Sequence, residues 1–156
     1  MKKSTTIILI VVAAFVAVFL ILGATGSTIT DVEYDYKIEV TDSFEDKYGN
    51  VEKPDPGYQF AILTYHIYNK SYSNGISTNP LTWQMKVNVG GLNYSWSPME
   101  TYSHPGYRLI DVPKGSDASG VQVFEVPVGY SASEMKGVLN AIFTYAKIEY
   151  NPNLAV

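Results

Sequence analysis

The chain has 156 residues, a formal net charge of −4 and no cysteine. This length suits one domain, and the lack of cysteine excludes disulfides, thiolate metal sites, thiol nucleophiles and a lipid-modified cysteine. Its single arginine and scattered lysines exclude the clustered positive charge on which nucleic-acid binding depends.

A long apolar segment lies near the N-terminus. It begins at Ile7 and ends at Gly26, and no charged residue occurs from position 4 to position 30. About 20 apolar residues of helix cross a bilayer, so residues 7–26 predict a transmembrane anchor. The run is longer than the apolar part of a cleaved signal peptide, although cleavage after Gly26 remains an alternative. A buried helix of a soluble domain is a third interpretation, which the lack of a polar face disfavours.

The charges that flank this segment predict its orientation. Lys2 and Lys3 precede it, whereas Asp31, Glu33 and Asp35 follow it. Positive flanks stay in the cytoplasm, so we expect residues 1–28 to form the anchor and residues 29–156 to form a domain outside the membrane.

The first half of the domain alternates strands with polar loops. Residues 29–40 alternate apolar and polar side chains, which predicts a half-buried strand whose acidic face is solvated. Residues 58–69 form the most apolar run of the domain and predict a central strand. Residues 41–57 and 70–80 are rich in glycine, proline, serine and asparagine, and they predict loops.

The second half begins with a predicted hairpin around Gly90-Gly91, a pair that supplies the positive φ of a two-residue turn. The sequence then predicts a loop over 97–106, strands over 107–112 and 121–126, a helical turn at the capping box 131–134, and one strand over 137–150. These patterns total about seven strands and predict an all-β fold, an antiparallel β-sandwich of two sheets.

Four features follow one another in an order that resembles a known family. They are a glycine-aromatic start to a strand that ends at Asn69, a strand pair across Gly90-Gly91, a turn at Lys114-Gly115, and a strand that ends in Val126-Pro127. From about residue 57 to residue 150 the chain resembles secreted immunoglobulin-like domains of unknown function, which are common in bacterial and archaeal lipoproteins and membrane-anchored proteins. Their fold is similar to that of a mycobacterial immunoprotective secreted antigen. The resemblance implies an immunoglobulin-like fold and an extracytoplasmic location, and no catalytic residue.

No motif indicates catalysis, a cofactor or a metal ion. His66 and His104 are the only histidines, and no short spacing links them as metal ligands. The sequence has no nucleophile elbow and no glycine-rich phosphate loop before a helix. The acids between positions 42 and 55 form a weaker candidate for a cation site, and we expect them to be solvated.

Aromatic residues and two sequons supply the candidate contact sites. Trp83, Tyr94, Trp96 and Tyr102 form a possible surface for a glycan or a protein partner. The alternative is that at least one tryptophan fills the core. Asn69 and Asn93 begin possible glycosylation sequons.

These observations predict a non-enzymatic, membrane-anchored domain that binds a protein or serves the cell envelope. A carbohydrate-binding module is one alternative. A pilin-like filament subunit is another, although Ser4 follows Lys3 where such subunits carry a glycine or alanine processing site.

Overall fold

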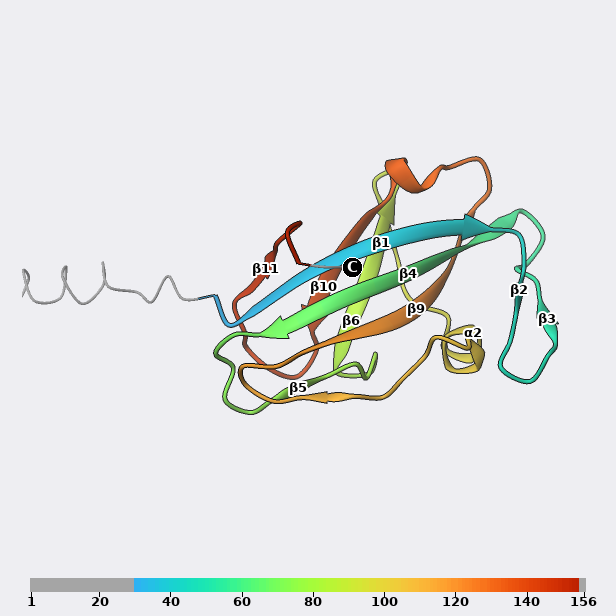
Figure 1. The fold of residues 1–156 in the computed structure, drawn as a ribbon. Coiled ribbons are helices and arrows are strands. Elements are labelled where there is room, and N and C mark those ends of the chain that lie inside the picture. Colours follow the sequence, from blue (N-terminus) through green and yellow to red (C-terminus); the bar gives the residue numbers. More distant parts are fainter. Residues whose placement is uncertain (1–29, 155–156) are drawn as a thin grey trace, which may run out of the picture.

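The structure is a computed structural model that describes residues 30–154 (Figure 1). The predicted anchor, residues 7–26, and the predicted cleavage point after Gly26 lie outside these residues. Between residues 30 and 154, no helix has the length and apolar character to cross a membrane.

Strands dominate the described part of the chain, so the fold is all-β. One sheet has the order β11-β1-β4-β9, a second has the order β10-β6-β7, and two short pairs are β2-β3 and β5-β8. The first sheet contains β1 (Val32–Thr41), β4 (Tyr58–Asn69), β9 (Asp117–Pro127) and β11 (Ile148–Tyr150). The second contains β6 (Trp83–Val89), β7 (Leu92–Tyr94) and β10 (Lys136–Ala141). The short strands are β2 (Phe44–Glu45), β3 (Val51–Glu52), β5 (Ile76–Ser77) and β8 (Asp111–Val112), and the helical segments are α2 (Pro98–Ser103) and the 3₁₀ turn Ala132–Glu134.

Buried side chains from both larger sheets belong to one core cluster. The inward face of β4 supplies Leu63, Tyr65 and Ile67, and β6 supplies Met85 and Val87, all of which are fully buried in one cluster. In Figure 1, β6 and β10 run across the direction of β1, β4 and β9. The predicted central strand over 58–69 is confirmed, because β4 has these bounds and pairs with β1 on one side and β9 on the other.

A buried amide links the two sheets directly. Gln122 of β9 is fully buried, and its side-chain oxygen accepts a hydrogen bond from the backbone N–H of Met85 at 3.0 Å. Its side-chain nitrogen donates to the backbone carbonyl of Trp83 at 3.2 Å. The pairs between β6 and β7 run only from Val87 to Val89 on the β6 side, so Gln122 satisfies backbone groups that β7 does not reach.

Two other local predictions are confirmed. β6 and β7 form the hairpin around Gly90 and Gly91, whose φ values are 58° and 82°. The capping box also forms, since the side chains of Ser131 and Glu134 bond reciprocally across the 3₁₀ turn. Both features depend on residues close together in sequence, which is why the sequence predicts them.

The predicted single strand over 137–150 is wrong. β10 ends at Ala141, the chain forms a loop over 142–147, and β11 begins at Ile148 in the other sheet. β11 pairs in parallel with β1. The sheet is therefore mixed, whereas the sequence predicts an antiparallel one. The residues between the two strands are mostly apolar, and apolar character by itself does not indicate where a chain changes sheet.

Three segments predicted as loops or a turn contain regular structure. Residues 41–57 include β2 and β3, residues 70–80 include β5, and residues 97–106 include α2. The predicted strand over 107–112 shortens to β8.

The helix α2 covers the free edge of β9. The hydroxyl of Thr101 accepts a hydrogen bond from the N–H of Val123 at 2.9 Å. Ser97 donates its N–H to the carbonyl of the same valine at 2.7 Å.

The acidic face of β1 is not the solvated surface that the sequence predicts. Asp31 accepts hydrogen bonds from the N–H of Lys147 at 2.8 Å and from Ser71 at 2.9 Å. Glu33 pairs with Lys70 at 2.7 Å, and Asp35 is buried. These carboxylates therefore hold β11 and the residues beside it against β1.

These carboxylates predict an acid-sensitive edge of the sheet. The backbone hydrogen bond from Lys147 lowers the pKa of Asp31, and the hydrogen bond from Lys70 lowers the pKa of Glu33. Because both folded-state pKa values lie below the unfolded values, the stabilisation is complete above about pH 5 and is lost as the pH falls through the folded values. We expect the amide of Asn151, which donates to the Tyr34 carbonyl at 2.8 Å, to lose protection from hydrogen exchange in acid.

The control for this prediction is the centre of the sheet. Amides of β4 that pair with β9, such as those between Leu63 and Ile67, are expected to keep their protection over the same range of pH. Protection factors, which correct for the intrinsic pH dependence of exchange, make the comparison. Equal loss of protection in β4 and β11, or no loss in either, would contradict the conclusion that Asp31 and Glu33 hold this edge of the sheet.

Candidate functional site

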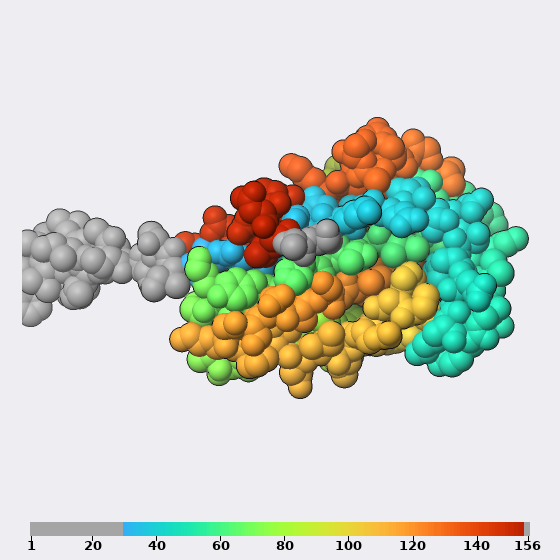
Figure 2. Space-filling model, in the orientation of Figure 1, coloured from blue at the N-terminus to red at the C-terminus, as the bar shows by residue number. Residues whose placement is uncertain are grey.

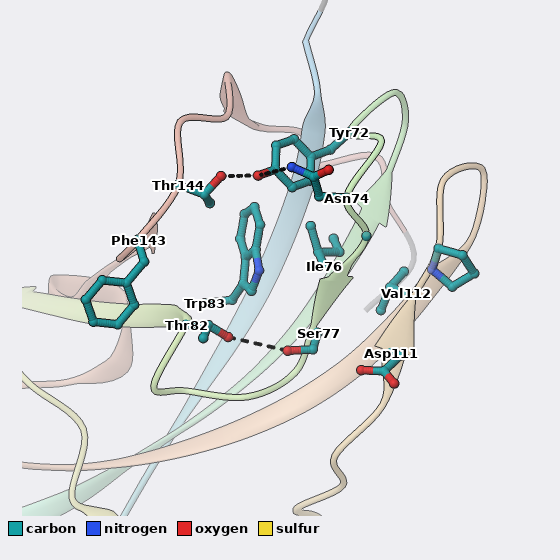
Figure 3. Close-up of a pocket in the computed structure, with 12 residues that line it drawn as sticks. Tyr72, Asn74, Ile76, Ser77, Thr82, Trp83, Asp111, Val112, Phe143 and Thr144 are labelled. Atoms are coloured by element: carbon teal, nitrogen blue, oxygen red, sulfur yellow. Dashed lines mark hydrogen bonds between the residues drawn. The ribbon is translucent and has the colours of Figure 1, made fainter.

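A pocket of about 510 Å³ opens at the end of the domain where β1 begins (Figure 3). The loops that follow β4, precede β6 and follow β10 form it together with the short β5-β8 pair. Its aromatic lining comes from Tyr72, Trp83 and Phe143, and its polar lining includes Asn74, Ser77, Thr82, Asp111 and Thr144. This volume is within the range of small-molecule sites.

The aromatic side chains of the pocket differ in how much surface they offer. Trp83 is only 4% exposed and packs edge-on against Tyr72, with ring centroids 5.9 Å apart. The Tyr72 hydroxyl hydrogen-bonds the hydroxyl of Thr144, which fixes the tyrosine in the wall. Phe143 is largely exposed at the rim (Figure 3). The pocket therefore offers an apolar wall with scattered hydroxyls, and the only ionisable carboxylate among its lining residues is Asp111.

The four predicted contact aromatics do not form one surface. Trp96 and Tyr102 lie together, with ring centroids 5.5 Å apart, and Tyr107 continues the group. Trp83 lies elsewhere, in the pocket, and Tyr94 is half-buried against the core. The register pairs Val87 with Tyr94, so the two tryptophans do not face each other across the hairpin.

Both tryptophans belong to the core, as the alternative interpretation of the sequence held. Trp83 and Trp96 are 4% and 8% exposed. Sugar stacking needs an open ring face, which neither offers. The observations therefore favour core packing for both tryptophans. Of the four predicted contact residues, Tyr102 is the most exposed.

The two sequon asparagines lie in opposite environments. Asn69 is fully buried, and its amide nitrogen donates to the carbonyls of Tyr72 and Val112, each at 3.0 Å. A glycan on this nitrogen is incompatible with the folded domain. Asn93 is exposed beside the Gly90-Gly91 turn and hydrogen-bonds Asn88 at 3.0 Å.

One cluster of potentially reactive side chains was missed by the sequence analysis. On the outer face of β4 and β9, the Nδ1 atom of His66 lies 2.9 Å from the Ser119 hydroxyl. Its Nε2 atom lies 2.9 Å from a carboxylate oxygen of Asp117. The register of the two strands creates this group, since it places Ser119 opposite His66, and no spacing in the sequence predicts it.

The geometry of this cluster does not reproduce an acyl-transfer site. Serine hydrolases place the nucleophile on Nε2 and the carboxylate on Nδ1, whereas His66 has the reverse order. A hydrolase also needs a pocket beside the nucleophile, and Ser119 lines neither the pocket beside Trp83 nor the shallow pocket beside Leu139 and Tyr145. The cluster fits a cross-strand hydrogen-bond network.

The other histidine and the acids between positions 42 and 55 do not form a metal site. His104 packs against Phe44 with ring centroids 5.1 Å apart, and burial lowers the pKa of His104. Asp46 accepts hydrogen bonds from the N–H groups of Tyr48 and Asn50, so it organises its own loop. Within residues 30–154, no group of three or more histidine and acidic side chains is placed to hold a metal ion.

Comparisons with known proteins leave the family open. No protein-family model matches the chain, and no curated protein matches it. A crystal structure of a conserved hypothetical protein from Bacillus anthracis aligns with a TM-score of 0.48 and 12% sequence identity, over 73% of this chain and 85% of that one. This is a distant similarity to a protein of unassigned activity.

Proposed function

We propose that this protein is a non-enzymatic domain, anchored in the cytoplasmic membrane by residues 7–26, that binds a protein or another component of the cell envelope. The domain lies outside the membrane and has the immunoglobulin-like β-sandwich fold. The single core shared by the β11-β1-β4-β9 and β10-β6-β7 sheets supports this fold. The apolar sequence that ends four residues before Thr30 supports the anchor.

The proposed binding role is based on where exposed apolar side chains lie in the domain. The chain enters the domain at the start of β1, and β2 and β3 lie at the opposite end (Figure 2). There Tyr48 is 73% exposed and Val51 is 64% exposed. Val128 is exposed at the same end, since its N–H bonds the carbonyl of Gly57 beyond the end of β1. An anchored domain presents this end away from the bilayer, where a partner protein has access.

The chemistry of the described side chains supports a role without catalysis. The His66 cluster has the wrong order of ring nitrogens, and the Tyr72–Trp83 pocket has no acid–base pair among its lining residues. The burial of both tryptophans weakens the carbohydrate-binding alternative. Nothing in residues 30–154 bears on the pilin-like alternative, whose processing site would lie before residue 7.

Crosslinking in intact cells tests the binding role. A photoreactive residue in place of Tyr48 is expected to capture a discrete partner of defined mass. The same residue in place of Lys114, which is also exposed but lies at the end near Asn69, is the matched control. Equal patterns from the two positions, or no adduct from Tyr48, would contradict a binding surface at the far end.

Extraction of cell membranes at alkaline pH tests the anchor separately. The full chain is expected to remain in the membrane pellet. A variant with Phe15→Asp and Phe19→Asp introduces two charges into the apolar run, and a charge at a helix centre costs about 3 kcal/mol each on insertion scales. This variant is expected to be released. Release of the unchanged chain would contradict the anchor.

A further inference from the structure

The loop over residues 142–147 exposes apolar side chains at one end of the domain. Phe143 is 85% exposed and Tyr145 is fully exposed, and Ile142 beside them is also exposed. Soluble domains seldom leave adjacent aromatic side chains this open without a contact that covers them. This loop links β10 to β11 and is the segment that the sequence predicts as the middle of a strand.

Hydrogen bonds fasten the loop to the point where the chain enters the domain. The N–H groups of Asp31 and Val32 donate to the carbonyl of Lys147 at 2.9 and 3.1 Å. The N–H of Lys147 returns a bond to the Asp31 carboxylate at 2.8 Å. At the other end of the loop, the N–H of Ile142 donates to the carbonyl of Thr82 at 2.9 Å. The exposed rings therefore keep a fixed position relative to the start of β1.

The length of chain before β1 limits how far this loop can lie from a membrane. Thr30 is four residue steps from Gly26, the end of the apolar segment. Even a fully extended chain spans at most about 3.5 Å per residue, or about 14 Å here. The loop is thus confined near the outer surface of the bilayer if residues 7–26 span it.

Resting on the anchor proposed above, we infer that loop 142–147 lies in the interfacial layer of the bilayer, with Phe143 and Tyr145 among the lipid headgroups. Aromatic rings favour this layer because it accepts an apolar ring and a polar edge together. The loop has no cluster of positive charge, since Lys147 lies beside Asp31 and Asp111 lines the same pocket as Phe143. The contact therefore depends on the rings, and it needs no anionic lipid.

Fluorescent labels on the full chain test this contact. The chain has no cysteine, so Tyr145→Cys and Phe143→Cys each give one site for a polarity-sensitive fluorophore, and their exposure leaves the core unchanged. Tyr48→Cys, another exposed tyrosine at the far end, is the matched control. In phosphatidylcholine vesicles we expect emission from positions 143 and 145 to shift to the blue and to be quenched by lipid with a nitroxide headgroup. Emission from position 48 is expected to remain that of a label in water.

Flotation of the same vesicles distinguishes a failure of the loop contact from a failure of the anchor. If the labelled chain floats with the vesicles while labels at 143 and 145 report water and escape quenching, the contact is overturned and the anchor stands. If the chain does not float with the vesicles, the anchor fails and the contact fails with it. A blue shift that appears only after phosphatidylserine is added to the vesicles would replace the aromatic contact with an electrostatic one and overturn the inference.

Discussion

Replacement of Gln122 by leucine is expected to lower the free energy of unfolding by about 3 kcal/mol. Leucine is apolar and one heavy atom smaller than glutamine, and it has no hydrogen-bonding group. The N–H of Met85 and the carbonyl of Trp83 then lose their partners inside the core. A buried backbone group without a partner costs about 1–3 kcal/mol. The hydrophobic gain from leucine offsets part of this loss.

Urea denaturation of the full chain in mild detergent, followed by tryptophan fluorescence, measures the effect. Gln59→Leu is the matched control, because the Gln59 amide donates to two carbonyls, those of Pro127 and Tyr130, but lies near solvent. Water replaces these bonds, so we expect a loss below about 1 kcal/mol. Equal losses for the two variants would show that Gln122 is not a link between the sheets.

Asn69→Asp is expected to destabilise the fold by about 3 kcal/mol at neutral pH. The buried amide nitrogen of Asn69 donates to the carbonyls of Tyr72 and Val112. A carboxylate of the same shape has no donor, so it faces two carbonyl oxygens without water. Only the bond that the Asn69 side-chain oxygen accepts from the N–H of Tyr72, at 2.9 Å, is retained.

The destabilisation by Asn69→Asp is expected to depend on pH in a stated direction. Burial among acceptors raises the folded-state pKa of the new carboxyl above its unfolded value. The penalty is then greatest above the folded pKa and shrinks as the pH falls toward the unfolded value, because the protonated acid regains one donor. Asn93→Asp, at an exposed sequon, is the control and is expected to change stability little at any pH. A penalty that grows in acid beyond that of the unchanged chain would contradict the hydrogen-bond assignment.

Local patterns in the sequence predict much of this fold. Strict alternation marks β1, continuous apolarity marks β4, and Gly90-Gly91 marks the hairpin, because each depends on neighbours in the chain. The start of α2 also had a signal in Ser97-Pro98, a capping residue followed by a proline at the first helical position. The prolines and glycine of residues 97–106 instead favour the predicted loop.

Features that depend on register and on distant partners were not predictable. His66 meets Ser119 only because β4 and β9 pair in one register out of several. The local sequence predicts that Asp31 and Glu33 are solvated. In the fold they accept hydrogen bonds from Lys147 and Asn151, which flank β11 more than a hundred residues later. The change of sheet within residues 137–150 follows from the same long-range pairing, which the local alternation of the segment does not encode.

Every functional inference above depends on the proposed placement of the domain outside the cytoplasmic membrane. Intact cells that produce the full chain with Tyr48→Cys, treated with a membrane-impermeant maleimide, test it most directly. If the domain lies outside the membrane, the exposed thiol at position 48 is labelled as fully in intact cells as after lysis. Labelling only after lysis would place the domain in the cytoplasm and contradict the account.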